Sequence, residues 1–188
     1  MSPDILRQEI AALDRAEWTT WPHAYGSARD TPGHLTALLD DDHEAQRGAA
    51  RHFSSAIVHQ TSVWPASPDA FAWLVRVLRE RPPPDDILED CLGALAEAGE
   101  YLGDVPTGPA PELSREGRRW LRKFGKTPDD EHDILWERFL GAEVNQEVYD
   151  WVLARMAGLR PAVADLVTAL SDRVPTACDA VRAAWSVR

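Results

Sequence analysis

Two segments of this chain share one pattern, in which a leucine-lined helix precedes an acidic turn and a second helix lined with small residues. In the first copy, HLTALLDDDHEAQRGAARHF, the apolar residues recur at the spacing of one helical face: Leu35, Leu38, Leu39, Ala45, Ala49, Ala50 and Phe53. The aspartates at 40–42 favour a helix start, because carboxylates accept hydrogen bonds from its unpaired amides. Alanines let two helices lie close together, so the pattern predicts an antiparallel helix pair over 34–53.

The second copy, at 67–96, follows the first at the spacing of a helical repeat. Leu74 comes 39 positions after Leu35, near the roughly 40–47 residues expected of such arrays. An S-P-D start and an RPPP stop bound its first helix, and Asp85 or Asp86 is expected to cap the second. The two apolar stripes comprise Phe71, Leu74, Val75 and Leu78, then Ile87, Leu88, Cys91, Leu92, Leu95 and Ala96.

A weaker third copy lies near the end of the chain. Its matching apolar and acidic residues and its closing helix comprise Leu166, Ala169, Leu170, Asp172, Val181, Ala184 and Trp185. Between the second and third copies, the Pro/Gly-rich stretch GDVPTGPAP interrupts the pattern with an irregular loop near 103–114. Helical periodicity resumes around 115–124, 130–140 and 144–156. No segment shows sustained period-2 alternation, so we expect an all-α fold.

We therefore expect a single domain over 1–188, built as a right-handed stack of helix pairs. Its parts would be an amino-terminal cap at 1–30, two clear repeats at 31–102, irregular helices at 103–157 and a carboxyl-terminal repeat at 158–188. A chain of 188 residues is long enough to bury one continuous core. Cys91 and Cys178 lack a second cysteine at metal or redox spacing, so both are expected to be packed thiols.

The combination L-x-x-L-L-x-D, a short gap and R-x-A-A resembles a HEAT repeat. The entry segment WTTWPHAYGSARDTP also resembles that of a group of uncharacterised bacterial HEAT-repeat proteins, in which a histidine–glutamine pair ends the second helix. The matching residues are His23, Ala24, Tyr25, Gly26, Ala28, Asp30, Pro32, His59 and Gln60. The resemblance covers roughly residues 13–102 and implies an α-solenoid, but this group has no established activity to carry over.

The chain carries a formal net charge of −11, with a pI of about 4.9. General nucleic-acid binding is not expected, because proteins of that class direct Lys and Arg at phosphates. An acidic surface suits solubility or attraction to a basic protein partner. No apolar run approaches the length of a membrane span, and the amino terminus has no signal-peptide core. We therefore expect a cytoplasmic protein that does not bind membranes.

His59 and Gln60 stand near Trp64 at the end of an apolar helical run, in AIVHQTSVWP. One interpretation is a structural joint, in which the polar pair caps the helix end and the tryptophan covers the turn into the second copy. The alternative is a polar pocket, in which His23 and Tyr25 join His59 and Gln60 around a small ligand or a substrate.

The sequence shows no motif of catalysis or metal binding. It has no G-x-S-x-G, no glycine-rich phosphate loop and no cysteine near a histidine, so no catalytic residue, metal or cofactor is expected. His52 and His59 lie two helical turns apart, which is too far for one zinc ion. The basic run at 115–126 could contact phosphates, but the acids of DDEHDILWERF follow it, and mutual pairing or solvation is the simpler explanation.

Trp18, Trp21 and Trp64 lie near loops, where aromatic side chains serve either in packing or as interface anchors. The candidate binding residues are Trp21, His23, Tyr25, His59, Gln60, Trp64, Asp40, Asp41 and Asp42. We expect a non-catalytic protein-binding module, for example an immunity-type or inhibitory protein that captures a basic partner on an acidic solenoid surface. The polar pocket is the alternative, as a small-ligand or enzyme site, and the oligomeric state is left open.

Overall fold

The structure of the protein, a computed structural model, describes residues 3–13, 18–59, 62–124 and 143–187. It is mostly helical, as the periodicity predicts, with a few very short strands. The helices are α1 (Pro3–Ala11), α3 (Thr31–Ala37), α4 (His43–His52), α5 (Ser67–Glu80), α6 (Asp85–Glu100), α7 (Arg115–Phe124), α9 (Glu143–Ala157), α10 (Arg160–Leu170) and α11 (Pro175–Trp185). Within this part of the chain, no helix combines the length and hydrophobicity that a bilayer span requires.

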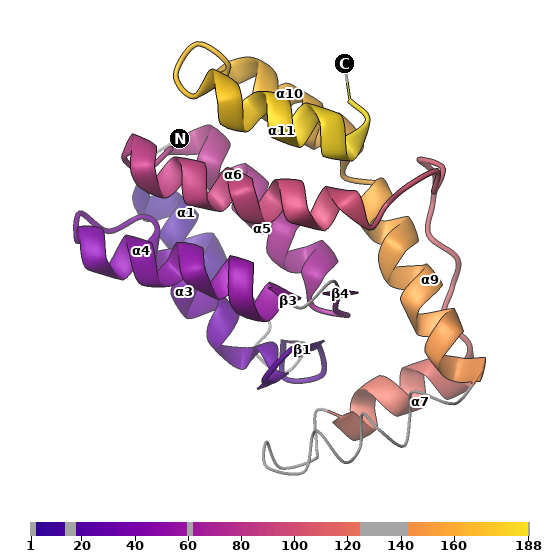
Figure 1. The fold of residues 1–188 in the computed structure, drawn as a ribbon. Coiled ribbons are helices and arrows are strands. Elements are labelled where there is room, and N and C mark those ends of the chain that lie inside the picture. Colours follow the sequence, from indigo (N-terminus) through magenta and orange to yellow (C-terminus); the bar gives the residue numbers. More distant parts are fainter. Residues whose placement is uncertain (1–2, 14–17, 60–61, 125–142, 188) are drawn as a thin grey trace.

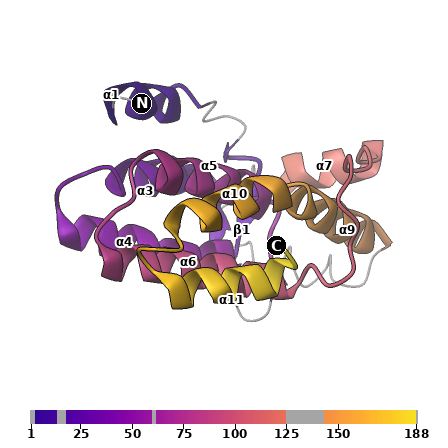
Figure 2. The same ribbon diagram turned by 90° about the horizontal axis from the view of Figure 1, so that it is seen from above.

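The chain forms three successive helix pairs, which are α3 with α4, α5 with α6, and α10 with α11. The three pairs are stacked next to one another (Figure 1). The first helices of the pairs form one layer, because α5 contacts both α3 and α10. The second helices form the other layer, because α6 contacts both α4 and α11 (Figure 2). Helix α1 lies against α3, on the outer side of the first layer (Figure 2).

Most helix starts follow the chemistry of their sequences. Proline occupies the first turn of α3, α5, α10 and α11, where its missing N–H would have no intrahelical partner. Helix α6 differs from the prediction, since its N-cap is Pro84, whereas Asp85 and Asp86 lie inside the first turn. Their carboxylates there still favour the positive end of the helix dipole.

One continuous apolar core runs through both layers. Trp185 of α11 is fully buried, and its indole Nε1 donates to the Leu95 carbonyl at 2.6 Å. A Cβ at Gly99 would overlap the Trp185 ring, so α6 and α11 approach closely only because this residue is glycine. Cys91 and Cys178 are free and buried, as predicted. Burial raises the pKa of the Cys91 thiol to about 12.

Helices α7 and α9 lie between the second and third pairs in the sequence and extend away from the stack (Figure 1). Trp151 of α9 stacks on Trp21 with ring centroids 5.3 Å apart, and Arg155 forms a 2.7 Å ion pair with Asp69 of α5. A smaller core joins α7 to α9 through Leu113, Leu121 and Val148. The helix predicted around 130–140, with the acids expected to pair with the basic run, lies outside the described residues.

Two hairpins and a π-helix depart from the all-helical prediction. Strand β1 (Pro22–His23) pairs with β2 (Gly26–Ser27), β3 (Val58–His59) pairs with β4 (Ser62–Val63), and α4 continues into the π-helix η2 (Phe53–Ile57). The prediction that His59 caps the second helix is therefore wrong, because the π-helix ends at Ile57 and His59 pairs with Ser62 in a strand. Strands of two residues are too short to leave an alternating pattern in the sequence.

Candidate functional site

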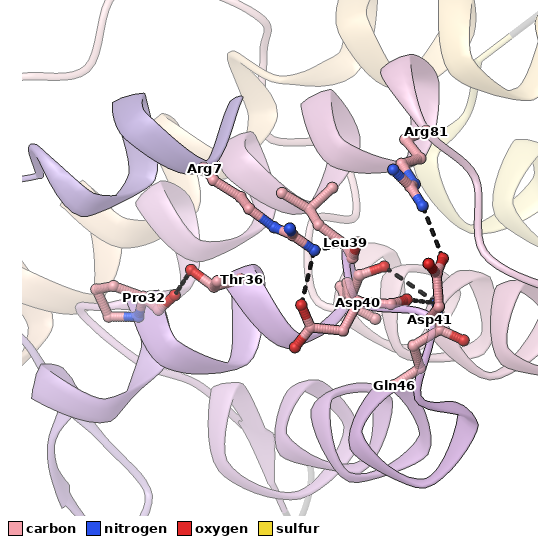
Figure 3. Close-up of polar contacts among 9 residues, drawn as sticks. Arg7, Pro32, Thr36, Leu39, Asp40, Asp41, Gln46 and Arg81 are labelled. Carbon is pink, nitrogen blue, oxygen red and sulfur yellow. Dashed lines mark hydrogen bonds and ion pairs between the residues drawn. The ribbon is translucent and has the colours of Figure 1, made fainter. Parts of the chain in front are cut away.

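The carboxylates of the acidic turn between α3 and α4 bind groups of the protein itself (Figure 3). Arg7 of α1 donates to Asp40 Oδ1 at 2.7 Å and to the Leu39 carbonyl at 2.5 Å. Arg81, at the end of α5, donates to Asp41 Oδ1 at 2.9 Å. The Asp41 side chain is 97% exposed, so this second pair is a weakly stabilising surface contact.

Asp42 has a different role in the same turn, as the N-cap of α4. Its backbone is extended, with φ −88° and ψ 108°, and its carboxylate accepts hydrogen bonds from the amides of Glu44 at 2.9 Å and Ala45 at 3.3 Å. The Gln46 amide closes the turn by donating to the Asp40 carbonyl at 2.7 Å. All three predicted acidic candidates thus have internal partners.

The two hairpins bring residues of the predicted polar pocket together. The β1–β2 hairpin is anchored on the π-helix, since the Ala24 amide donates to the Ala56 carbonyl at 2.9 Å. From its turn, the Tyr25 hydroxyl lies 3.3 Å from His59 Nδ1, and the two rings are 5.1 Å apart. Gly26 completes the turn with φ 130°, a conformation that residues with a Cβ rarely adopt.

The other candidate residues near the hairpins belong to the joint or fall outside it. Gln60 lies outside the described residues. Trp21 is half-buried against α9. Trp64 is half-buried as well; its amide donates to Ser67 Oγ at 2.8 Å, and that hydroxyl donates to the Ile57 carbonyl at 2.6 Å. These bonds fix the turn into α5, so this stretch forms a structural joint.

His23 is a structural residue whose two ring nitrogens are both occupied. It is only 4% exposed, and Nδ1 accepts a hydrogen bond from the Tyr25 amide at 3.1 Å. Nε2 lies 3.1 Å from Asp30 Oδ1. Because Nδ1 accepts, the neutral ring carries its proton on Nε2 and donates it to Asp30. The histidine thereby locks the hairpin to the segment that begins α3.

Asp30 is the centre of the site, although it is not among the predicted binding residues. It ends the 3-10 helix η1 (Ala28–Asp30) and occupies the N-cap of α3, but it makes no cap hydrogen bond because its backbone is helical, with φ −86° and ψ −22°. Its Oδ2 lies 4.0 Å from His34 Nε2 and 4.0 Å from His52 Nδ1. The carboxylate also interacts with the backbone amide of Asp30 itself, and the side chain is 50% exposed.

His34 and His52 form a stacked pair beside Asp30, with ring centroids 4.0 Å apart and planes 14° from parallel. His52 is buried, and its Nε2 lies 3.0 Å from the hydroxyl of Thr31. One part of this cluster carries a sequence signal, because Asp30 and His34 are four residues apart, at the spacing of one helical turn. His52 and His23 join only through the tertiary fold.

In this cluster Asp30 is charged at neutral pH, whereas His34 and His52 are neutral. Burial and the neighbouring His34 lower the pKa of His52 to about 3, against an opposing effect of Asp30. Burial also lowers the pKa of His34. Burial alone would raise the pKa of Asp30, but the hydrogen bond from His23 and the charge of the histidines bring it down to about 2. At neutral pH an ionised carboxylate therefore lies beside two neutral imidazoles.

A cavity of about 500 Å³ opens onto this cluster. Its lining includes Tyr25, Asp30, His34, Gly48, Arg51 and His52. A Cβ at Gly48 would meet no atom within 4 Å, so α4 leaves the space open at that point. Among the described residues, His59 is not part of this lining and contacts it through Tyr25. The π-helix that follows α4 contributes Ser55 to the cavity wall, and such helices are frequent at functional sites.

Asp30, His52 and Thr31 follow the carboxylate–imidazole–hydroxyl order of a catalytic triad, but their geometry does not suit nucleophilic attack. Thr31 is fully buried, so its hydroxyl cannot reach a substrate. The carboxylate lies 4.0 Å from the imidazole, and a histidine with a pKa of about 3 is a weak base at neutral pH. The Ser55 hydroxyl donates to the Arg51 carbonyl at 2.6 Å rather than to a histidine. The arrangement suits binding.

His23, Asp30 and His52 also place possible metal-ligating atoms within 4.8 Å of one another. A neutral imidazole has one nitrogen with a free lone pair, and His23 uses it to accept the Tyr25 amide. Coordination through the other nitrogen would require the ring to lose both protons or to lose that hydrogen bond. The group is therefore better explained as a hydrogen-bonded cluster than as a metal centre.

Comparisons with known proteins do not identify a family or a function for this chain. The chain matches no protein-family model, and comparisons with curated proteins and with solved structures found no significant similarity. The resemblance to HEAT repeats therefore stays a prediction.

Proposed function

We propose that this protein is a non-catalytic binding protein that holds a small polar ligand in the cavity beside Asp30, His34 and His52, here called the histidine cavity. One observation carries the proposal: an ionised, half-exposed carboxylate lines an open cavity together with two imidazoles, which lie no closer than 4.0 Å to its Oδ2. A few convergent polar groups, among them a charged one, are what fixes the orientation of a ligand in a concave site.

The histidine cavity supports this proposal better than the acidic turn does. Asp40 and Asp41 contact arginines of the same chain, and Asp42 is held by the amides that it caps. A ligand at the turn would have to displace these contacts before it gained its own. A ligand in the cavity would add hydrogen bonds to Asp30 without breaking any that the described residues form.

The test is to fill the cavity without disturbing the fold. Gly48→Phe places an aromatic ring on α4 where a Cβ meets nothing within 4 Å, and Gly93→Phe does the same on α6, away from the cavity. Replacing glycine inside a helix also favours helix formation in both variants. Each protein is dialysed against a polar metabolite extract, and the retained compounds are identified by mass spectrometry.

We expect the wild-type chain and the Gly93→Phe variant to retain the same small molecule and the Gly48→Phe variant to lose it. Retention by all three proteins would place the ligand elsewhere and contradict the proposal. Retention by none would contradict it as well, provided that circular dichroism shows each variant to be folded.

A second candidate function is the capture of a basic protein partner, and a surface of α6 favours it. Asp86, Asp90, Glu97 and Glu100 follow one face of this helix, and no arginine or lysine of the described chain pairs with the last three. In this version the chain is a cytoplasmic inhibitory or immunity-type protein. Affinity capture with the wild-type chain should then recover a basic protein that an Asp90→Lys, Glu97→Lys variant does not, whereas equal recovery would contradict it.

The same three helix pairs support the proposal that the chain is a short right-handed α-solenoid of the HEAT type. First helices contact first helices and second helices contact second helices, which is the arrangement of a stacked array. Helices α7 and α9 would then be an insertion between its second and third repeats.

A further inference from the structure

We infer that the ligand of the histidine cavity is a small zwitterion with one amine and one carboxylate, as in an amino acid, whose amine binds Asp30 and whose carboxylate binds Arg51. This inference rests on the proposed function and names the class of its ligand. Three features of the cavity support it: the acceptors around Asp30, the cation on the rim, and a charge pattern that singly charged ligands do not match.

The acceptors around Asp30 fit a protonated amine. Oδ2 is separated by 4.0 Å from His34 Nε2 and by 4.0 Å from His52 Nδ1. Two acceptors at that separation can each lie about 2.8 Å from one nitrogen, which is the length of a charge-assisted hydrogen bond. An ammonium group has three N–H donors and no acceptor, so it can donate to the carboxylate and to imidazole nitrogens together.

The histidines can present lone pairs to such an amine. The Thr31 hydroxyl contacts His52 Nε2 at 3.0 Å and can accept its proton, and in that tautomer Nδ1 carries the lone pair of the ring. His34 Nε2 lies at the same distance, 4.0 Å, from the same carboxylate oxygen. A zinc ion would fit less well, because bonds of about 2.0–2.1 Å would place ligands 4.0 Å apart almost opposite each other instead of tetrahedrally.

Arg51 supplies the complementary charge. It projects from α4 one residue before His52, it is exposed, and it lines the same cavity. No carboxylate in the described part of the chain forms an ion pair with it, and Asp30 is not within ion-pair distance of it. A guanidinium of this kind binds a carboxylate through two parallel hydrogen bonds.

Singly charged ligands match only half of this arrangement. A simple anion would contact Arg51 but would face the carboxylate of Asp30, and a simple amine would contact Asp30 but would share the cavity with two arginines, Arg29 and Arg51. A zwitterion places each of its charges beside the opposite charge of the protein. The chain length between the two charges is left to the experiment.

The experiment measures binding of named zwitterions by isothermal titration calorimetry. The probes are the twenty common L-amino acids and the linear ω-amino acids from glycine to 6-aminohexanoate. The tightest binder is then compared with its analogue lacking the amine and its analogue lacking the carboxylate. The variants are Asp30→Asn, which keeps the acceptor for His23, and Arg51→Gln, with Asp90→Asn and Arg79→Gln as matched controls outside the cavity.

We expect at least one zwitterion to bind about tenfold or more tightly than either analogue, since each lost charge-assisted bond costs about that much. Asp30→Asn should erase the advantage over the analogue without the amine, and Arg51→Gln the advantage over the analogue without the carboxylate. Both controls should bind as the wild-type chain does.

Two results would overturn the inference. One is that the zwitterion and an analogue bind equally to the wild-type chain; the other is that no probe binds. If dialysis still yields a compound that Gly48→Phe excludes, the ligand is of another class and the proposed function stands. If dialysis also yields nothing, the proposed function fails with it.

Discussion

Asp30 and Asp42 occupy the same formal position, the N-cap of a helix, yet the fold uses them differently. Asp42 precedes α4 with an extended backbone, and its carboxylate accepts two amide hydrogen bonds of that helix. Asp30 precedes α3 with a helical backbone inherited from η1, and its carboxylate makes no cap bond. It turns to His23 and to the cavity instead.

The difference shows that residue type and position do not settle whether an aspartate is structural. An extended N-cap aims the side chain back at the helix amides, which satisfies it locally. A helical backbone at the same position aims it away, so the carboxylate becomes available to other elements. Substitutions around the two aspartates test this contrast, and the first is at His23, which holds Asp30 in its orientation.

The largest effect is expected for His23→Ala, with a loss of about 2–4 kcal/mol in the free energy of unfolding. The substitution removes a buried ring and leaves the Tyr25 amide and Asp30 Oδ1 without the partner that they have now. Urea denaturation followed by circular dichroism measures the loss.

His59→Ala is the matched control for His23, since His59 is half-exposed and its contact with the Tyr25 hydroxyl is long, at 3.3 Å. It should cost less than His23→Ala. If both variants lose the same free energy of unfolding, the view that buried His23 holds the hairpin in place and half-exposed His59 does not is wrong.

The next effect is a loss of stability on mild acidification. The pKa of His52 is about 3 in the folded chain against an ordinary value of 6.5, so protonation favours the unfolded chain. Stability is full above about pH 6.5 and falls as the pH decreases toward 3, by about 2 kcal/mol between pH 7 and pH 5. The low pKa of Asp30, about 2 against 3.8, acts only below about pH 4, with stability again lost as the pH falls.

His52→Gln removes the titrating ring, so its free energy of unfolding should change less between pH 7 and pH 5 than that of the wild-type chain. Denaturant titrations at the two pH values give this difference. Identical pH dependence in both proteins would mean that His52 does not carry the effect.

A smaller effect is expected at the capping aspartate. Asp42→Ala removes both hydrogen bonds to the α4 amides and should lower the free energy of unfolding by about 1 kcal/mol. Asp42→Ser should retain most of the stability, because serine is also a good N-cap. A full loss with serine would indicate that the charge, and not the cap, is what matters there.

The smallest effect is expected at Asp41→Ala, which should leave the unfolding midpoint nearly unchanged. Its ion pair with Arg81 is formed by a side chain that is 97% exposed, and such pairs are screened by water and salt. A midpoint shift as large as that of Asp42→Ala would contradict the view that this pair is a surface contact.

Much of the helical framework could be predicted from the sequence, because helices are local. The leucine face of α3, the alanine face of α4 and the RPPP stop after α5 each act within a few residues. The hairpins could not be predicted, since strands of two residues depend on contacts such as that of the Ala24 amide with the Ala56 carbonyl. For the same reason, His59 was wrongly expected at a helix end.

Only some residues of the site could be predicted, because the others meet through tertiary contacts. His23 and Tyr25 were selected because they stand out in the entry segment, and the structure places both at the cavity. His52 was considered only as a partner for His59 along one helix, whereas its actual neighbours are His34 and Asp30. Their association depends on how η1 and α4 pack together, and no sequence spacing encodes that.

By itself, the sequence determined where helices begin, end and bury their apolar faces, because periodicity and capping are properties of neighbouring residues. The tertiary structure alone decided which polar groups are satisfied and which remain available. Asp40 and Asp41 are engaged because α1 and the end of α5 bring arginines to them. Asp30 reaches the cavity because the helical turn before it directs the carboxylate away from the α3 amides and toward three histidines.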